Sequence, residues 1–311
     1  MKSRAGILYA DLLLLLTAAI WGFAFVAQRV GMENIGPYAF NAVRYAIGVL
    51  ILLPLIWHRK RKAPEAKAAA ENNPSKHGGL LKRMLPFLVT GSVMFIGASL
   101  QQLGIVTTTA GNAAFVTSLY VVIIPLLASF FGRETVFKDY AAALISVFGL
   151  YIITVGFSSG FSIAPGDLLV LAGSLFWAIH ILVIGKFASS VDPIKLSAGQ
   201  FAVCGFLSFI AALLFEPAPF AGTFKALVPL LYGGLLSCGV AFTLQIVAQR
   251  RAPPAHASIL LATEGLFGAI GGVLLLDEPA TIRLFAGGAL MLGAAILSQL
   301  PVGKAKGARA P

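Results

Sequence analysis

The chain has 311 residues, of which 58% are apolar and 11% are charged, and its net charge at pH 7 is +11. Soluble domains carry about 25% charged residues, so this composition excludes a surface that faces water on all sides. A net charge of this size would suggest nucleic-acid binding in a soluble protein. Here the basic residues fall between long apolar runs, which favours a role in membrane topology. We therefore expect an integral membrane protein that binds no nucleic acid.

Ten apolar segments are long enough to cross a hydrocarbon core of about 30 Å, which takes about 20 helical residues. The sequence predicts helices at 10–30, 37–57, 84–106, 112–131, 138–156, 166–187, 194–215, 225–248, 256–276 and 281–301. The first apolar run follows Lys2 and Arg4 but shows no small-residue cleavage site, so we interpret it as a retained helix. The predicted fold class is an all-α integral membrane protein with ten transmembrane helices.

The distribution of Lys and Arg predicts the orientation of these helices. Residues 58–83 are rich in Lys, Arg, Ala, Asn and Pro and have no periodic apolar face, which indicates a flexible cytoplasmic loop. With the N-terminus inside, 19 of the 23 basic residues fall on the cytoplasmic side. The others are three outside residues and one residue within a helix, namely Arg29, Lys225, Arg283 and the buried Arg44. Both termini are predicted to face the cytoplasm of a bacterial-type inner membrane.

The chain matches itself when it is shifted along its own sequence. A shift of 156 residues sets Trp21 over Trp177, and a shift of 144 residues sets Gln101 over Gln245. Each half then holds five helices, and an odd number gives the two halves opposite orientations in the membrane. Many secondary transporters have inverted repeats of this kind, which open a central site alternately to each side.

Two segments resemble a known family. Residues 112–134 and 257–279 are each an apolar helix closed by a Gly-or-Asp, Glu signature, and on these motifs the chain resembles the EamA family of the drug/metabolite transporter superfamily. The resemblance implies two inverted five-helix repeats, at 1–157 and 158–303, around a central cavity. It also implies export or exchange of amino acids, related metabolites or drugs, with no cofactor and no ATP hydrolysis.

Two charged residues stand out because they lie deep within predicted helices, where a charge costs about 2.5 kcal/mol or more at the helix centre. Arg44, about seven residues into the second helix, can hold a carboxylate by a bidentate pair or bond to helix carbonyls to hold the fold. Glu264, about eight residues into the ninth helix, can pair with Arg44, meet a substrate amine or take up a proton. For both residues a binding role and a structural role stay open.

The other predicted substrate-binding residues are aromatic or amide side chains, namely Trp21, Trp177, Tyr120 and Gln245. Aromatic faces receive organic cations or flat apolar ligands, although each ring alone is more often a packing residue. The repeat sets Tyr120 over Glu264 and Gln200 over Arg44, so the charges are not duplicated. We therefore expect a cavity whose walls from the two halves of the chain differ in charge.

These features predict a secondary transporter that exports small metabolites, such as amino acids or related amphipathic compounds, by alternating access. One alternative is an obligate exchanger resembling nucleotide-sugar antiporters, which should have more basic cavity residues. Another is a non-transporting membrane sensor or scaffold. An enzyme is not expected, because the sequence has no HExxH or GxxxxGK[ST] motif. The expected partners are a small-molecule substrate and the lipid bilayer, with a coupling proton as one option, and the expected state is a monomer or weak homodimer.

Overall fold

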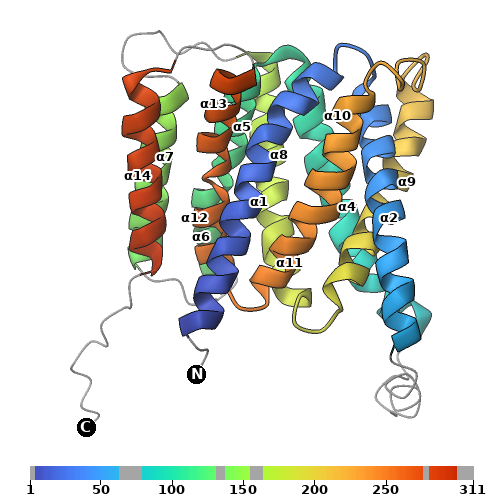
Figure 1. Ribbon diagram of the computed structural model, residues 1–311, viewed down its shortest axis with the longest axis horizontal. Coiled ribbons are helices and arrows are strands. Elements are labelled where there is room, and N and C mark those ends of the chain that lie inside the picture. The colour runs from blue at the N-terminus through green and yellow to red at the C-terminus, as the bar shows by residue number, and fades with distance from the viewer. Residues whose placement is uncertain (1–3, 63–78, 131–136, 155–163, 276–279, 300–311) are drawn as a thin grey trace.

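All regular structure in the described part of the chain is helical (Figure 1). The computed structural model describes residues 4–62, 79–130, 137–154, 164–275 and 280–299. In chain order its helices are α1 (Arg4–Gly31), α2 (Pro37–Lys62), α4 (Leu80–Thr107), α5 (Ala110–Ser118), α6 (Tyr120–Phe130), α7 (Phe137–Thr154), α8 (Pro165–Phe187), α9 (Pro193–Phe215), α10 (Leu227–Leu231), the π-helix η2 (Tyr232–Phe242), α11 (Thr243–Gln249), α12 (Pro254–Leu261), α13 (Glu264–Leu275) and α14 (Ile282–Gln299).

The described helices have the length and composition of membrane spans. Eight helical segments are long and apolar enough to cross a bilayer, and a ninth, shorter apolar helix covers Ile282–Ser298. Their bounds agree with the predicted helices to within a few residues. The predicted helix at 138–156 corresponds to α7, which is 18 residues long. The structure therefore confirms a multi-pass, all-helical membrane protein.

The outer surface of the helices is apolar, and several polar side chains lie inside. Leu50 and Phe206 are each 64% exposed, whereas Gln102, Gln200 and Gln245 are fully buried. This pattern is the reverse of the one in a soluble protein. It suits a molecule whose outer surface contacts lipid.

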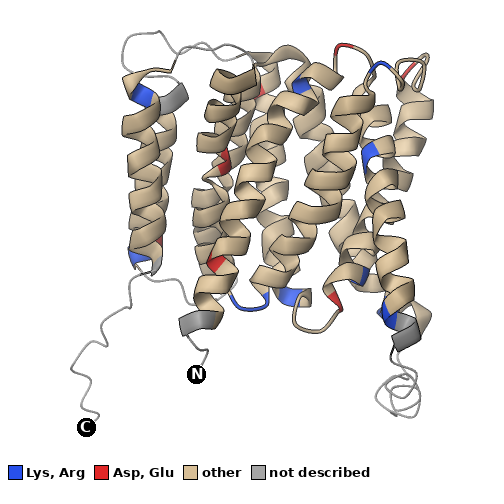
Figure 2. Cartoon of the chain, viewed as in Figure 1, with Lys and Arg blue, Asp and Glu red and all other residues tan. Residues whose placement is uncertain are grey.

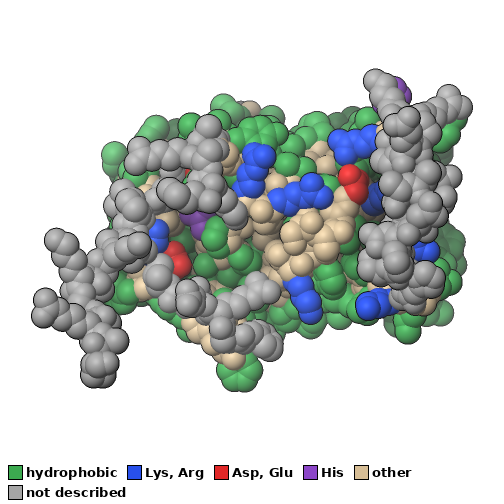
Figure 3. Space-filling view, turned by 90° about the horizontal axis from the view of Figure 1, so that it is seen from below, with side chains coloured by type: hydrophobic (Ala, Val, Ile, Leu, Met, Phe, Trp, Pro, Cys, Tyr) green, Lys and Arg blue, Asp and Glu red, His purple; other side chains and the backbone are tan. Residues whose placement is uncertain are grey.

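Most Lys and Arg residues of the described chain lie close to the ends of the helices (Figure 2). The start of α1 and the end of α14 lie at the same face, the lower one in Figure 1. Seen from below, this face carries several separate Lys and Arg side chains (Figure 3). The basic side chains thus gather at the face where the described chain both begins and ends.

Helices from the two halves of the chain pack closely against each other. The main pairs are α4 with α8, α2 with α9, α7 with α14, and α1 with α13. A Cβ atom on Gly104 of α4 would lie 2.6 Å from the carbonyl oxygen of Gly166 in α8, so only glycine fits there. Small residues let membrane helices approach this closely.

Two membrane-spanning segments are broken near their middle. α5 ends at Ser118 and α6 starts at Tyr120, while α12 ends at Leu261 and α13 starts at Glu264. Near each break a hydroxyl donates to a main-chain carbonyl: Ser118 to Ala114 at 2.8 Å, and Thr263 to Leu260 at 2.6 Å. Such bonds compete with the helical ladder. The shift of 144 residues sets one break over the other.

The segment from α10 to α11 is irregular in another way, because its central 11 residues form η2. The same shift sets η2 over residues 88–98 of α4, which are α-helical throughout. Equivalent segments of the two halves therefore differ in helix type, since residues 232–242 are π-helical and residues 88–98 are α-helical. π-helical turns are rare and are often found at functional sites.

Some predicted features fall outside the described residues. They include most of the basic loop, at 63–78, and the two Glu-containing signatures, at 131–136 and 276–279.

Candidate functional site

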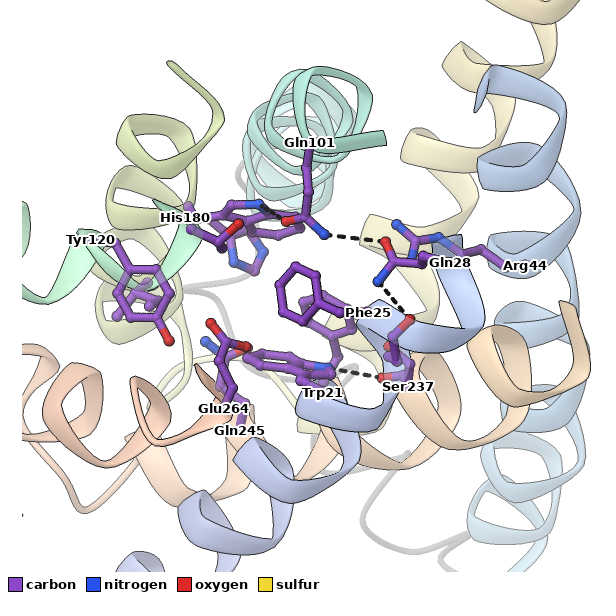
Figure 4. Close-up of a pocket in the computed structure, with 15 residues that line it drawn as sticks. Trp21, Phe25, Gln28, Arg44, Gln101, Tyr120, His180, Ser237, Gln245 and Glu264 are labelled. Atoms are coloured by element: carbon purple, nitrogen blue, oxygen red, sulfur yellow. Dashed lines mark hydrogen bonds between the residues drawn. The ribbon is translucent and has the colours of Figure 1, made fainter. Parts of the chain in front are cut away.

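A cavity lies among the helices near the two breaks (Figure 4). All six predicted site residues line it: Trp21, Arg44, Tyr120, Trp177, Gln245 and Glu264. Nine further residues, which sequence reasoning did not place in the predicted set, complete the lining: Ala24, Phe25, Gln28, Gln101, Thr117, His180, Ile181, Ser237 and Phe242. The lining combines aromatic rings with a few polar groups, as in many small-molecule sites.

Residues that the sequence repeat sets over one another meet in this cavity. Trp21 of α1 and Trp177 of α8 both line it, and so do Tyr120 and Glu264, the first residues of α6 and α13. α6 and α13 therefore both begin at the cavity, and the N-terminal end of a helix dipole is positive. The repeat supplies equivalent positions, and the side chains at those positions differ in charge.

One wall of the cavity is tied together by hydrogen bonds. Trp177 Nε1 donates to Gln101 Oε1 at 2.7 Å, and Gln101 Nε2 donates to Gln28 Oε1 at 3.1 Å. Gln28 Nε2 in turn donates to the carbonyl oxygen of Ala24 at 3.1 Å. This chain joins α8, α4 and α1, so Gln101 holds helices together, and its amide is already occupied.

The opposite wall carries buried polar atoms without a hydrogen-bond partner. They are Thr117 Oγ1, Tyr120 Oη, Glu264 Oε1, and both Nε2 and Oε1 of Gln245. The Tyr120 hydroxyl points toward the Glu264 carboxyl (Figure 4). A buried polar group without a partner costs about 1–3 kcal/mol, so such groups are rare and call for an explanation. A polar ligand in the cavity would satisfy them.

Arg44 lies at another part of the cavity and is only 3% exposed. Its Nη2 donates to Tyr45 Oη at 3.1 Å, and its guanidinium carbon lies 4.8 Å from the centre of the Tyr45 ring and 5.7 Å from that of Phe40. Its Nε has no hydrogen-bond partner. Aromatic contacts stabilise a guanidinium without neutralising it.

Arg44 and Glu264 do not pair in this structure. Among the described residues, no carboxylate oxygen lies within 4.0 Å of the Arg44 guanidinium. The two side chains lie at opposite ends of the view in Figure 4, with Phe25 between them. The predicted alternative of an Arg44–Glu264 pair is therefore not realised, and both side chains remain available to a ligand.

His180 faces the cavity from α8 and is held by packing and by one hydrogen bond. Its Nε2 lies 2.9 Å from Gln200 Oε1, while its Nδ1 has no partner. Its ring meets Trp177 and Phe242 edge-on. Gln200, the repeat mate of Arg44, thus orients a histidine.

The model of the EamA-like transporter family matches residues 8–155 and again 164–300 of this chain. An uncharacterized transporter of Archaeoglobus fulgidus is 30% identical over 297 residues, which cover 95% of this chain and 87% of the relative. The threonine/homoserine exporter RhtA of Escherichia coli is 28% identical over 303 residues, covering 94% of this chain and 92% of RhtA. A solved crystal structure that is 19% identical matches with a TM-score of 0.73, over 96% of this chain and 97% of the solved chain. This likeness shows the fold alone.

Proposed function

Because this chain belongs to the EamA-like transporter family, we propose that it exports small amphipathic metabolites, such as amino acids, across the inner membrane. The family and the exporter among its relatives support a non-enzymatic transporter. The observation that carries the substrate class is the cavity itself. It combines aromatic rings, a buried cation and unpartnered polar atoms, and an amphipathic metabolite has complementary groups for each.

We propose that transport proceeds by alternating access between two inverted five-helix repeats, at 1–157 and 158–303. The packing supports this arrangement, because helix pairs occur in symmetry-related sets. α4 packs on α8, and the equivalent segment of the second half, η2 with α11, packs on α1. In the same way α8 packs on the half-helices α5 and α6, and α1 packs on the half-helices α12 and α13. The pairs α2–α9 and α7–α14 each join equivalent helices of the two halves. This is the packing expected of ten spans related by a pseudo-twofold axis in the membrane plane.

Both termini face the cytoplasm in this proposal. The support is the gathering of Lys and Arg at the face where α1 begins and α14 ends (Figures 2 and 3). Short loops rich in these residues are retained on the cytoplasmic side.

The six predicted residues have distinct roles in the proposed site. Arg44 binds the carboxylate of the substrate, and Glu264 with Tyr120 and Gln245 binds its amine or hydroxyl groups. The two remaining residues, Trp21 and Trp177, shape the apolar part. Glu264 is also the proposed site of a coupling proton, because it is a buried carboxyl group at membrane depth with no ion-pair partner among the described residues.

The test is efflux of a panel of amino acids and uncharged analogues from preloaded vesicles at two pH values. We expect Arg44→Ala to abolish efflux of carboxylated solutes, and Glu264→Gln to remove the pH dependence. Arg59→Ala is the matched control, because this arginine is exposed at the end of α2 and its ion pair, with Asp192, lies outside the cavity. Wild-type efflux in both cavity variants, each inserted in the membrane at normal levels, would show that these charges are structural.

A further inference from the structure

The inverted repeat makes Trp177–Gln101 and Trp21–Gln245 equivalent pairs, but only one of them is bonded. Trp177 Nε1 donates to Gln101 Oε1 at 2.7 Å. Trp21 Nε1 donates instead to the carbonyl oxygen of Ser237, at 3.4 Å. Both polar atoms of the Gln245 amide lack a partner. One bond of a symmetric pair is therefore made and the other is open.

The π-helix η2 lies where the two halves differ. Gln245 lies three residues beyond the end of η2, whereas Gln101 lies within the continuous α-helix α4. A π-helix bonds residue i to residue i+5, so its wider turn rotates the residues that follow it relative to an α-helix. Ser237, the present acceptor of Trp21, belongs to η2. The acceptor that Trp21 uses in this structure is therefore a main-chain carbonyl of η2 itself.

We propose that the two Trp–Gln bonds are made alternately during transport. In the state of this structure Trp177 holds Gln101, and in the oppositely open state Trp21 holds Gln245 while Gln101 is released. The proposal rests on the alternating-access function, in which the two repeats exchange conformations, so that a bond made in only one repeat belongs to one state. η2 adopts α-helical geometry when Trp21 leaves Ser237 for Gln245.

The alternation also assigns Gln245 a role in substrate selection. Gln101 Nε2 is occupied by Gln28, but the repeat sets Ile184 over Gln28, and isoleucine offers no acceptor. The Gln245 Nε2 atom therefore stays free to donate to a ligand in both states. Gln245 is the amide that recognises an acceptor group on the substrate throughout the cycle.

The test measures from which side of the membrane the cavity is open. A single cysteine is placed in the cavity wall as Ala24→Cys, after the two buried native thiols are removed by Cys204→Ala and Cys238→Ala. A membrane-impermeant thiol reagent is applied to right-side-out and to inside-out vesicles, and the ratio of the two labelling rates is recorded. We expect Trp177→Phe and Trp21→Phe to change this ratio in opposite directions, each by roughly two- to tenfold, the range that one intramolecular hydrogen bond supplies.

Second variants keep the test independent of any one substitution. Gln101→Leu should shift the ratio as Trp177→Phe does, and Gln245→Leu as Trp21→Phe does. Trp57→Phe, at a tryptophan 58% exposed and outside the cavity lining, is the matched control and should leave the ratio unchanged. If Trp177→Phe and Trp21→Phe change the labelling ratio in the same direction, or not at all, the alternation of the two bonds is wrong. Labelling of the cysteine from both sides would still support alternating access. Labelling from one side alone in every variant contradicts the proposed function itself.

Discussion

Nε2 of His256 lies 2.7 Å from Oδ1 of Asp11, so a largely buried polar contact joins the start of α12 to α1. His256 Nδ1 also lies 3.1 Å from the hydroxyl of Ser298 in α14. The repeat mate of Asp11 is Asp167, which accepts a hydrogen bond from Thr108 between α4 and α5. Each repeat therefore has an aspartate that ties its first helix to the region where a broken helix begins.

The first prediction concerns the stability of this contact. We expect Asp11→Ala to lower the free energy of unfolding by about 1–3 kcal/mol, because it removes the partner of a largely buried His256 nitrogen. The measurement is thermal or denaturant unfolding in detergent. Arg59→Ala removes an ion pair whose side chains are 62% and 35% exposed, and should cost less than about 1 kcal/mol. Equal losses in the two variants would contradict the expected importance of the buried pair.

The second prediction concerns the close approach of α4 and α8. A methyl group on Gly104 would meet the carbonyl oxygen of Gly166 at 2.6 Å, and main-chain atoms move only at a cost. Gly104→Ala should therefore destabilise the protein by about 1–3 kcal/mol in the same unfolding assay. Gly111→Ala is the matched control, because a Cβ there meets nothing within 4 Å and alanine is the better helix former. A neutral Gly104→Ala would mean that α4 and α8 separate easily.

The third prediction concerns pH. Glu216, at the end of α9, accepts hydrogen bonds from the backbone N–H groups of Tyr38 and Ala39 at 2.7 and 3.2 Å. Partial burial nevertheless raises the pKa of Glu216 above its ordinary value of 4.5, although the two bonds oppose this change. The folded state then binds the proton more tightly, so this group's contribution to stability falls as pH rises from 4.5 through the raised pKa.

Glu216→Gln tests this sign, because glutamine keeps an acceptor oxygen and does not titrate. We expect the variant to lose the fall in stability across that pH window, as measured by unfolding at a series of pH values. Asp192, which caps the start of α9 by accepting from the backbone N–H groups of Ile194 and Lys195, supplies the comparison through Asp192→Asn. If the free energy of unfolding of the wild type, but not of Glu216→Gln, rises over this pH range, the pKa of Glu216 is lowered by folding and the prediction is wrong.

The fourth prediction separates the charge of Arg44 from its shape. Arg44→Lys keeps the charge but loses the planar group that lies over Tyr45. We expect the KM for carboxylated substrates to rise about tenfold with little change in the amount of inserted protein, whereas Arg44→Gln should abolish their transport. Normal KM values for Arg44→Lys would mean that only the charge matters.

The helices and the membership of the cavity could be predicted because both follow from simple patterns. Apolar length defines a membrane span, and the sequence repeat indicates which positions of the two halves correspond. Trp21, Trp177, Tyr120 and Glu264 are two such pairs, and all four line the cavity.

The breaks and the π-helix could not be predicted in the same way. Residues 232–242 and 88–98 are both apolar, and hydropathy does not distinguish a π-helical from an α-helical turn. Proline is no guide either, because Pro125 lies inside α6 rather than at the break. The hydroxyl residues Ser118 and Thr263, placed near equivalent positions of the repeat, were the available signal. Gln28 was missed because a single amide in an apolar helix gives no indication of its partner.

The broken helices also determine how far the cavity lies from each end of the helix bundle. α5 packs with α13 and α6 packs with α12, so the four half-helices form an upper and a lower pair in Figure 1. The longest of them, α13, has 12 residues and is about 18 Å long at 1.5 Å per residue, a little over half of the hydrocarbon core. A molecule held at the breaks is therefore separated from either face by one short pair of half-helices. In the alternating access proposed above, the tilt of one pair creates an exit while the other pair stays closed.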